Sequence, residues 1–200
     1  MLQRLLLVIS AMLLLAGLAA RPDQTLLAGP DADCGGDFRP LADAAVDQSA
    51  ADTALGEAGQ LQVRAASRDI DSLLYFDVLL DRSVTVHSAR LELTVSGGSL
   101  GRDAGFLVSN VLEPWAERSV TWNNQPRFRP GVARTSYALE RDKLSLDVTT
   151  LVRAWQAGPD LPQSFIIQGL TEGMDVTFYS REETDAALQP RMTIRCDSRR

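Results

Sequence analysis

Short runs in which apolar and polar residues alternate recur along most of the chain. A period of two places the apolar side chains on one face of a β-strand. The clearest alternation lies in residues 61–65, 91–95 and 192–194. Further runs rich in β-forming residues and bounded by turn residues lie at 73–78, 106–112, 144–148, 164–168 and 176–180. So many short strands predict an all-β sandwich or barrel.

One segment has helical spacing instead. Its apolar residues repeat at i, i+3, i+4 and i+7: Val148, Leu151, Val152 and Trp155. Asp147 stands where it can cap the first turn, and Gly158 with Pro159 ends the pattern. We predict one short helix that covers an open end or face of the strand layers, with Trp155 in the core.

The N-terminal residues predict export. Arg4 precedes an apolar run over 5–15, and small residues follow at Gly17 and Ala19, as in a secretory signal peptide. We therefore expect a signal peptide over 1–20, a flexible segment over 21–40, one domain over 41–196 and a tail over 197–200. The mature chain is expected to be secreted and to have no membrane span.

The sequence has two cysteines, Cys34 and Cys196, near the two ends of the mature chain. Two are too few for a thiolate metal site and suit one disulfide in an oxidising compartment. We predict that the two cysteines join the ends of the domain. Two unpaired cysteines in mobile end segments are the alternative.

The net charge of −6 argues against nucleic acid as a partner, because binding to phosphates needs a basic field. One loop departs from this acidity: Arg127, Phe128 and Arg129, followed by Arg134. Guanidinium groups can pair with sugar carboxylates or sulfates, and a ring offers a face to a pyranose. This loop is the candidate ligand-binding site. The alternative is that Phe128 packs on the core and the arginines only solvate a turn.

Several motifs occur in a fixed order along the chain. They are Asp43-Ala44-Ala45-Val46-Asp47, Leu73-Leu74-Tyr75-Phe76-Asp77, Ala89-Arg90-Leu91-Glu92-Leu93, Trp115-Ala116-Glu117, Val120-Thr121-Trp122-Asn123-Asn124-Gln125-Pro126, Asp147-Val148-Thr149 with Val152 and Trp155, and Phe178-Tyr179-Ser180-Arg181-Glu182. In these motifs the chain resembles the DNRLRE domain, also classed as carbohydrate-binding module family 96. The resemblance spans about residues 42–194. It implies an antiparallel, jelly-roll-like β-sandwich, extracellular, without catalytic activity, with polysaccharide binding in some members and structural roles in others. In two loops the chain departs from the family pattern, and Gly56 and Pro162 supply the turn chemistry there.

Within the matching motifs, Glu117 and Arg181 are expected to form an ion pair across the sandwich edge, with Glu182 nearby. The catalytic alternative makes Glu117 and Glu182 a pair of glycosidase carboxylates. Other schemes have less support. His87 is the single histidine, and the glycine-rich residues 96–101 predict a hairpin loop with no helix behind it.

We assign no metal site and no cofactor. A structural calcium ion near the first strand, where Asp43, Asp47 and Asp52 are available, stays open, although their spacing matches no defined calcium-binding loop. The sequence thus predicts a secreted, non-catalytic module that binds carbohydrate, with acidic polysaccharide favoured. The alternative is a structural or protein-interaction domain of the cell envelope or extracellular matrix.

Overall fold

The computed structural model describes residues 35–80, 83–99, 104–129, 137–140, 142–158 and 160–198. The expected signal peptide, most of the segment 21–40, Cys34 and Arg134 lie outside these residues. The strands are β1 (Gly36–Phe38), β2 (Ala42–Asp47), β3 (Gln60–Ala65), β4 (Ile70–Tyr75), β5 (Val84–Ser99), β6 (Phe106–Asn110), β7 (Tyr137–Glu140), β8 (Lys143–Asp147), β9 (Ser164–Gly169), β10 (Met174–Tyr179) and β11 (Arg191–Ser198). A 3-10 turn, η1 (Gln48–Ala50), and one α-helix, α1 (Thr149–Ala157), complete the described elements.

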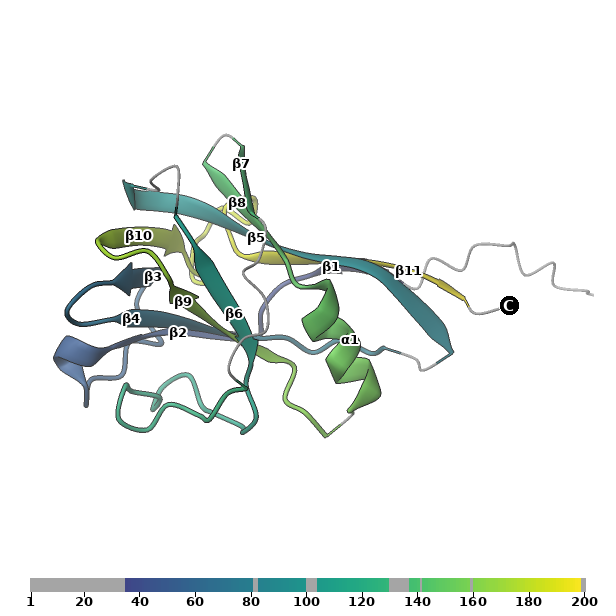
Figure 1. The fold of residues 1–200 in the computed structure, drawn as a ribbon, viewed down its shortest axis with the longest axis horizontal. Helices are drawn as coiled ribbons and strands as arrows, with labels where there is room; N and C mark the ends of the chain where they lie inside the picture. Colours follow the sequence, from purple (N-terminus) through teal and green to yellow (C-terminus); the bar gives the residue numbers. More distant parts are fainter. Residues whose placement is uncertain are drawn as a thin grey trace, which may run out of the picture.

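The strands form two layers that share β5 (Figure 1). The first sheet has the order β1, β11, β5, β8, β7, and every pairing in it is antiparallel. In the second sheet, the last residues of β5 pair with β10, which pairs with β3. That sheet continues through β4, which pairs with β2 and β9, to β6 on β9, and all of these pairings are antiparallel. The predicted all-β, sandwich-like fold is therefore confirmed.

The main core lies between the two layers and contains the inward-facing residue of each alternating pair. Leu61, Leu91, Phe106, Phe178 and Met192 are all 1% exposed or less. Because the polar partner of each alternating pair points outward, the period of two in the sequence appears directly as one buried and one solvated face.

The predicted helix is present and closes one end of this core. Asp147 Oδ1 accepts a hydrogen bond from the backbone N of Thr149 at 2.9 Å, so it satisfies a free donor in the first turn. Trp155 is 2% exposed, and its ring stacks on Phe165 with centroids 4.5 Å apart. Gly158 follows the last helical residue. The helix thus covers an open end of the sandwich with an aromatic side chain.

The prediction of a hairpin loop over residues 96–101 is wrong for its first part, because β5 continues to Ser99 and pairs with β10. The glycines that indicated a loop serve close strand pairing instead. Gly98 has a φ of +79°, and a Cβ there would lie 2.3 Å from the carbonyl oxygen of Asp175. Only glycine fits both conditions.

β1 lies inside the segment 21–40 that was expected to be flexible. It pairs with β11, Gly36 standing opposite Ile194, so the last residues of this segment are part of the first sheet. A strand of three residues is too short to show a period.

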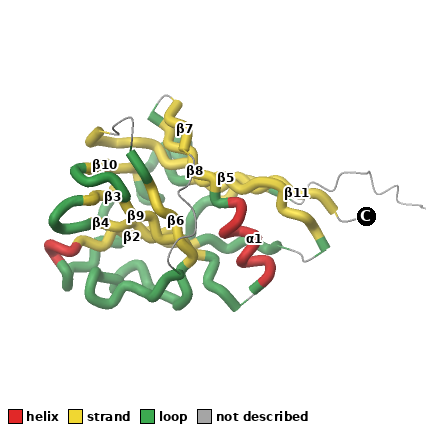
Figure 2. Tube along the Cα trace, viewed as in Figure 1, coloured by secondary structure: helices red, strands yellow, loops and turns green. Residues whose placement is uncertain are grey.

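An irregular segment over residues 111–129, the covering loop, lies against the outer face of the second sheet (Figure 2). Beneath it is a second apolar cluster formed by Ala44, Val46, Leu73, Val111, Val120 and Ile166. Trp115, Trp122 and Phe128 pack against this cluster and are partly buried. Among the described residues, no helix is long and apolar enough to cross a membrane.

Candidate functional site

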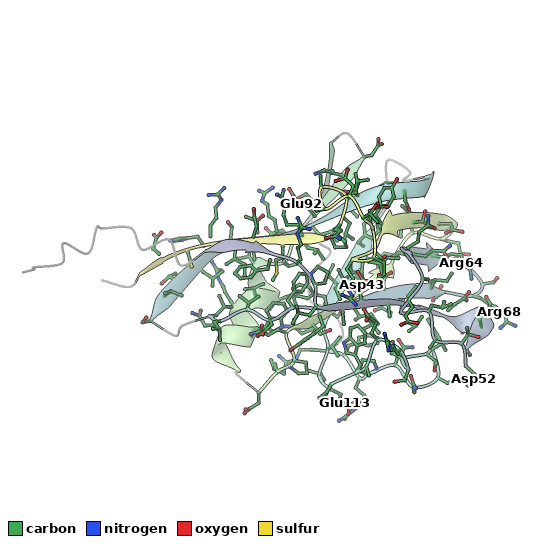
Figure 3. All side chains as sticks on the ribbon, turned by 180° about the vertical axis from the view of Figure 1, so that it is seen from behind. Asp43, Asp52, Arg64, Arg68, Glu92 and Glu113 are labelled. Atoms are coloured by element: carbon green, nitrogen blue, oxygen red, sulfur yellow. The ribbon has the colours of Figure 1, made fainter. Side chains whose placement is uncertain are left out.

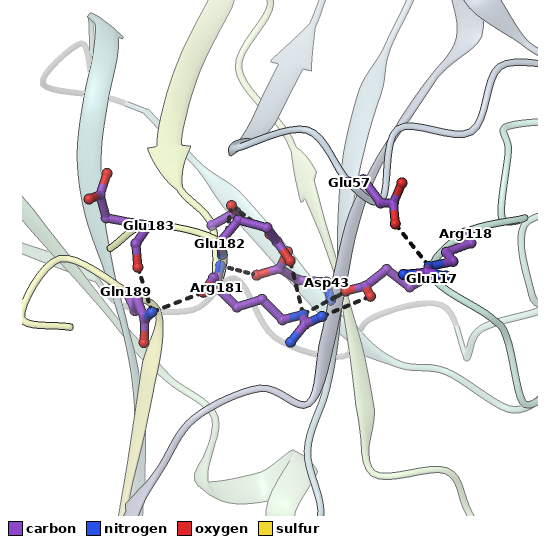
Figure 4. Close-up of polar contacts among 9 residues, drawn as sticks. Asp43, Glu57, Glu117, Arg118, Arg181, Glu182, Glu183 and Gln189 are labelled. Atoms are coloured by element: carbon purple, nitrogen blue, oxygen red, sulfur yellow. Dashed lines mark hydrogen bonds and ion pairs between the residues drawn. The ribbon is translucent and has the colours of Figure 1, made fainter. Parts of the chain in front are cut away.

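Arg181 is the centre of a charged cluster that joins the covering loop to the segment after β10 (Figure 4). Its Nε donates to Glu117 Oε1 at 2.8 Å and its Nη2 donates to Glu117 Oε2 at 3.0 Å. This is the bidentate geometry in which arginine binds a carboxylate most strongly. Arg181 Nε also lies 3.1 Å from Glu182 Oε1. The structure therefore brings together the three residues that the sequence analysis grouped.

Asp43 on β2 is the fourth member of this cluster, and the sequence analysis did not group it with the others. Its backbone N donates to Glu117 Oε1 at 2.9 Å, and its Oδ2 accepts from the backbone N of Arg181 at 2.8 Å. The residue is 1% exposed, and within the described part of the chain its Oδ1 has no hydrogen-bond partner. Burial raises the pKa of Asp43 to about 7, with the charges of Glu182 and Glu117 adding to the rise. The sequence feature that could have indicated this buried carboxylate is its position inside the otherwise apolar run Ala42–Val46.

The electrostatics of Glu117 oppose the glycosidase alternative. Burial alone would raise the pKa of Glu117, but the hydrogen bonds from Arg181 and from the Asp43 backbone outweigh it and lower the pKa. A glycosidase acid needs a raised pKa so that it can hold a proton. Glu182 is tied to the same arginine and accepts a hydrogen bond from Ser180 Oγ at 2.8 Å. The two carboxylates thus serve to anchor Arg181.

The tryptophan motif is architectural. Trp115 Nε1 donates to Ser164 Oγ at 2.8 Å, which fixes the covering loop to β9. Asn124 Oδ1 accepts from the backbone N of Thr121 at 2.7 Å, and Asn123 Nδ2 donates to Asp52 Oδ1 at 2.8 Å. Asn124 thus closes the turn that contains Trp122, and Asn123 joins this turn to the segment after η1. Of the three indoles, Trp155 is buried, whereas Trp115 and Trp122 are only partly buried.

The basic segment lies at the edge of the second sheet. Phe128 forms an isolated β-bridge with Val111, and the backbone N of Arg129 donates to Asn110 O at 2.9 Å. In such an extended segment, neighbouring side chains point to opposite sides. Phe128 packs on the second apolar cluster, so Arg127 and Arg129 point away from it. The structure therefore separates the ring from the two arginines.

The two arginines also differ from each other. Arg127 Nε donates to Glu113 Oε1 at 2.6 Å, and its backbone N donates to Glu113 Oε2 at 3.0 Å. These two hydrogen bonds lower the pKa of Glu113. Figure 3 shows Glu113 at the rim of the molecule, whereas Asp43 lies in its interior. The side chain of Arg129 is exposed and has no partner among the described residues.

Comparison with known families decides the classification. The model of carbohydrate-binding module family 96 matches residues 36–195, from the start of β1 almost to the end of β11. The chain belongs to this family. The resemblance seen in the sequence motifs is confirmed, and the module's expected partner class is carbohydrate. A search of curated proteins finds no match to the chain.

The remaining predicted residues of the module lie apart from the cluster. His87 is exposed, and its Nε2 lies 2.5 Å from Asp197 Oδ2. Cys196 is 3% exposed on β11, while Cys34 is outside the described residues, so their disulfide stays a prediction. Glu113, the partner of Arg127, was missed because nothing in the sequence indicated that residues 113 and 127 would be neighbours.

Proposed function

We propose that this module is a secreted, non-catalytic protein that binds an acidic polysaccharide through its basic edge segment. Membership of carbohydrate-binding module family 96 supports carbohydrate as the ligand class. The exposed pair Arg127 and Arg129 supports an anionic sugar, because guanidinium groups pair well with carboxylates and sulfates. Arg134, outside the described residues, is proposed to extend the same site.

The main support for this proposal is the position of Arg127 relative to Arg129. They stand two positions apart in an extended segment, so their side chains leave the same side of the chain at a spacing of about 7 Å. The backbone hydrogen bonds Arg129 N to Asn110 O (2.9 Å) and Leu112 N to Arg127 O (2.8 Å) hold the segment in place. Because the backbone is already held, two cations on one side of the segment can contact two anionic groups of one polymer without the cost of ordering the segment itself.

Glu113 tunes the site. Its carboxylate neutralises Arg127 in the free module, so a sugar carboxylate must compete with it for that guanidinium. Arg129 has no such competitor among the described residues and is proposed to make the first contact. Affinity is then expected to fall with rising salt, because both partners of the contact are exposed charges.

The test is a double substitution, Arg127→Ala with Arg129→Ala. We expect its retention in alginate-containing gels to fall at least about tenfold, since a hydrogen bond to a charged group contributes roughly 1.5 to 3 kcal/mol. Because both side chains are exposed, the thermal midpoint should change little.

Arg118→Ala is the matched control. Arg118 is also an exposed arginine of the covering loop, and it pairs with a single glutamate, Glu57, at 2.9 Å. It should retain full binding. Equal retention of the double variant and the control would place the site elsewhere. A glycan array with no bound glycan, together with a specific protein partner, would favour the structural or protein-interaction alternative.

A further inference from the structure

We propose that the cluster of Asp43, Glu117 and Glu182 binds one calcium ion. Each residue offers one carboxylate oxygen, and these three atoms lie within 4.8 Å of one another. Two oxygen atoms bound to the same Ca²⁺ at about 2.4 Å can be at most about 4.8 Å apart, so one ion can contact all three. The site is independent of the basic edge segment.

Asp43 gives the second, separate indication of a ligand. Its side chain is almost fully buried, at 1% exposure, and its Oδ1 has no hydrogen-bond partner within the described residues. An acceptor left unpaired in the interior is costly, so such groups generally have a partner. A protonated Oδ1 would need an acceptor for its O–H and would be equally unpaired. A cation on Oδ1 resolves this.

The other two carboxylates have acceptor capacity to spare. Glu117 Oε1 accepts hydrogen bonds from Asp43 N and Arg181 Nε, and Glu117 Oε2 accepts one from Arg181 Nη2. Glu182 Oε1 pairs with Arg181 Nε, and Glu182 Oε2 accepts a hydrogen bond from Ser180 Oγ. Asp43 Oδ2 accepts one from Arg181 N. Three ionised carboxylates offer roughly twelve lone-pair positions, so these contacts fill about half of them. Arg181 can therefore stay paired while the ion binds.

The charge of the cluster also fits a divalent ion. When Asp43 is ionised together with Glu117 and Glu182, the three carboxylates and one guanidinium have a net charge of −2 in a partly enclosed site. A calcium ion neutralises it. Calcium is favoured over magnesium, because magnesium demands a nearly ideal octahedron, whereas calcium accepts irregular sets of six to eight oxygen atoms that include water.

The ion would join three segments that are distant in sequence: β2, the covering loop and the residues after β10. Glu117 comes from the loop that covers the second sheet. Binding of calcium is therefore expected to stabilise the covering loop on the sandwich.

The test uses the mature chain, dialysed against chelator and titrated with calcium chloride by calorimetry. We expect one ion per chain, with a Kd on the order of 10⁻⁴ to 10⁻³ M or tighter, as in extracellular calcium-binding modules. At about ten times the Kd, the ratio of folded to unfolded protein should rise roughly elevenfold, visible as an upward shift of the melting curve. No heat and no shift with calcium would overturn the proposal.

Two variants locate the ion. Asp43→Asn and Glu182→Gln should each weaken calcium binding at least about tenfold. Substitution of a residue that only hydrogen-bonds to a metal ligand already weakens metal affinity by about this factor. Glu182→Gln keeps the bidentate pair of Arg181 with Glu117, so it decides the matter if Asp43→Asn fails to fold.

The matched control is Glu57→Gln, which removes an exposed carboxylate paired with Arg118, the residue next to Glu117. It should bind calcium as the unmodified chain does. If calcium binds equally well to Glu182→Gln and to the control, the ion lies elsewhere and the proposed site is wrong.

Discussion

The side chain of Asp71 is a buried carboxyl group whose surroundings favour its protonated form. It lies on β4, is 2% exposed and accepts a hydrogen bond from Gln168 Nε2 at 2.8 Å. Burial raises the pKa of Asp71 to about 7, and the charge of Asp69 adds to the rise, although the Gln168 hydrogen bond opposes it. The ionised form then costs the folded state about 4 kcal/mol above pH 7.

The sign of the resulting pH dependence follows from this raised pKa. Because the folded-state pKa of about 7 exceeds the unfolded value of 3.8, the stabilisation is complete below pH 3.8 and is lost as the pH rises through 7. Asp71→Asn should reduce the loss of unfolding free energy between pH 5 and pH 8 by roughly 2 to 3 kcal/mol. Urea unfolding at the two pH values measures this.

Asp175→Asn serves as the control for that experiment. Asp175 likewise accepts a hydrogen bond from a glutamine, Gln62, at 2.6 Å, but it is exposed. Its substitution should leave the pH dependence nearly unchanged. An Asp71→Asn variant with the pH dependence of the unmodified chain would show that Asp71 is ionised in the folded protein without penalty.

For single residues, the sequence predicted the charged groups that lie within the family-like motifs. Glu117, Arg181 and Glu182 were grouped because the matching motifs contain them, and they meet in the structure. Asp43 and Glu113 were not grouped with their partners. Their roles depend on which segments of the chain fold beside them, and no local sequence pattern predicts these neighbours. Asp43 and its partner Arg181, for example, are 138 positions apart in the sequence.

Among the elements, the covering loop depends on a close approach at Gly56. A Cβ at this position would lie 2.0 Å from the carbonyl oxygen of Glu117 and 2.8 Å from its Cγ. The loop before β3 therefore packs directly on the backbone of the covering loop, next to the charged cluster. No side chain larger than hydrogen fits without moving one of the two loops.

Gly56→Ala is consequently expected to destabilise the protein by about 1 to 3 kcal/mol, the usual cost of overpacking. The nearby Gly59 is a matched control, because a Cβ there would meet nothing within 4 Å. Gly59→Ala should be neutral or slightly stabilising, since it reduces the entropy of the unfolded chain. Thermal melts of both variants measure the contrast. Equal midpoints would mean that the two loops can move apart at no cost.

The elements that the sequence predicted well are those with a repeating period. Alternation located β3, β5 and β11, and helical spacing located α1. β1 and β7 were missed because three or four residues contain too few repeats to show a period. The end of β5 was misjudged because glycines that permit close strand pairing resemble glycines that permit a turn.

For the whole molecule, the pairing of β1 with β11 bears on the predicted disulfide. The register sets Gly36 opposite Ile194. We keep the prediction that Cys34 and Cys196 form a disulfide, because Cys34 comes two positions before β1 in the sequence and Cys196 lies on β11, the strand that pairs with β1.

Mass spectrometry of the unreduced, alkylated protein checks this prediction, which requires that neither cysteine takes up the reagent. Because the closed loop spans nearly the whole domain, Cys34→Ser is expected to lower the unfolding free energy by up to roughly 4 to 5 kcal/mol. The same variant in the presence of reductant should match the reduced unmodified chain. Alkylation of both cysteines in the native protein would contradict the pairing.

The fold class and the family followed from features spread over the whole chain, so local errors did not affect them. The ligand did not follow in the same way. Arg127, Phe128 and Arg129 are adjacent in sequence, but the bridge of Phe128 to Val111 turns the ring away from the arginines. A binding site depends on which side of the backbone each of its side chains points to. The sequence of a loop does not predict these directions while the conformation of the loop is unknown.

β5 belongs to both layers of the sandwich, pairing with β11 and β8 along its first part and with β10 along its last. Neither layer can be removed while the other keeps all its hydrogen bonds. A single peptide-bond cut within this strand would therefore weaken both halves together, and fragments split there should not persist as separate folded pieces. Proteolytic degradation of a domain with a backbone shared in this way requires cooperative opening of the entire domain.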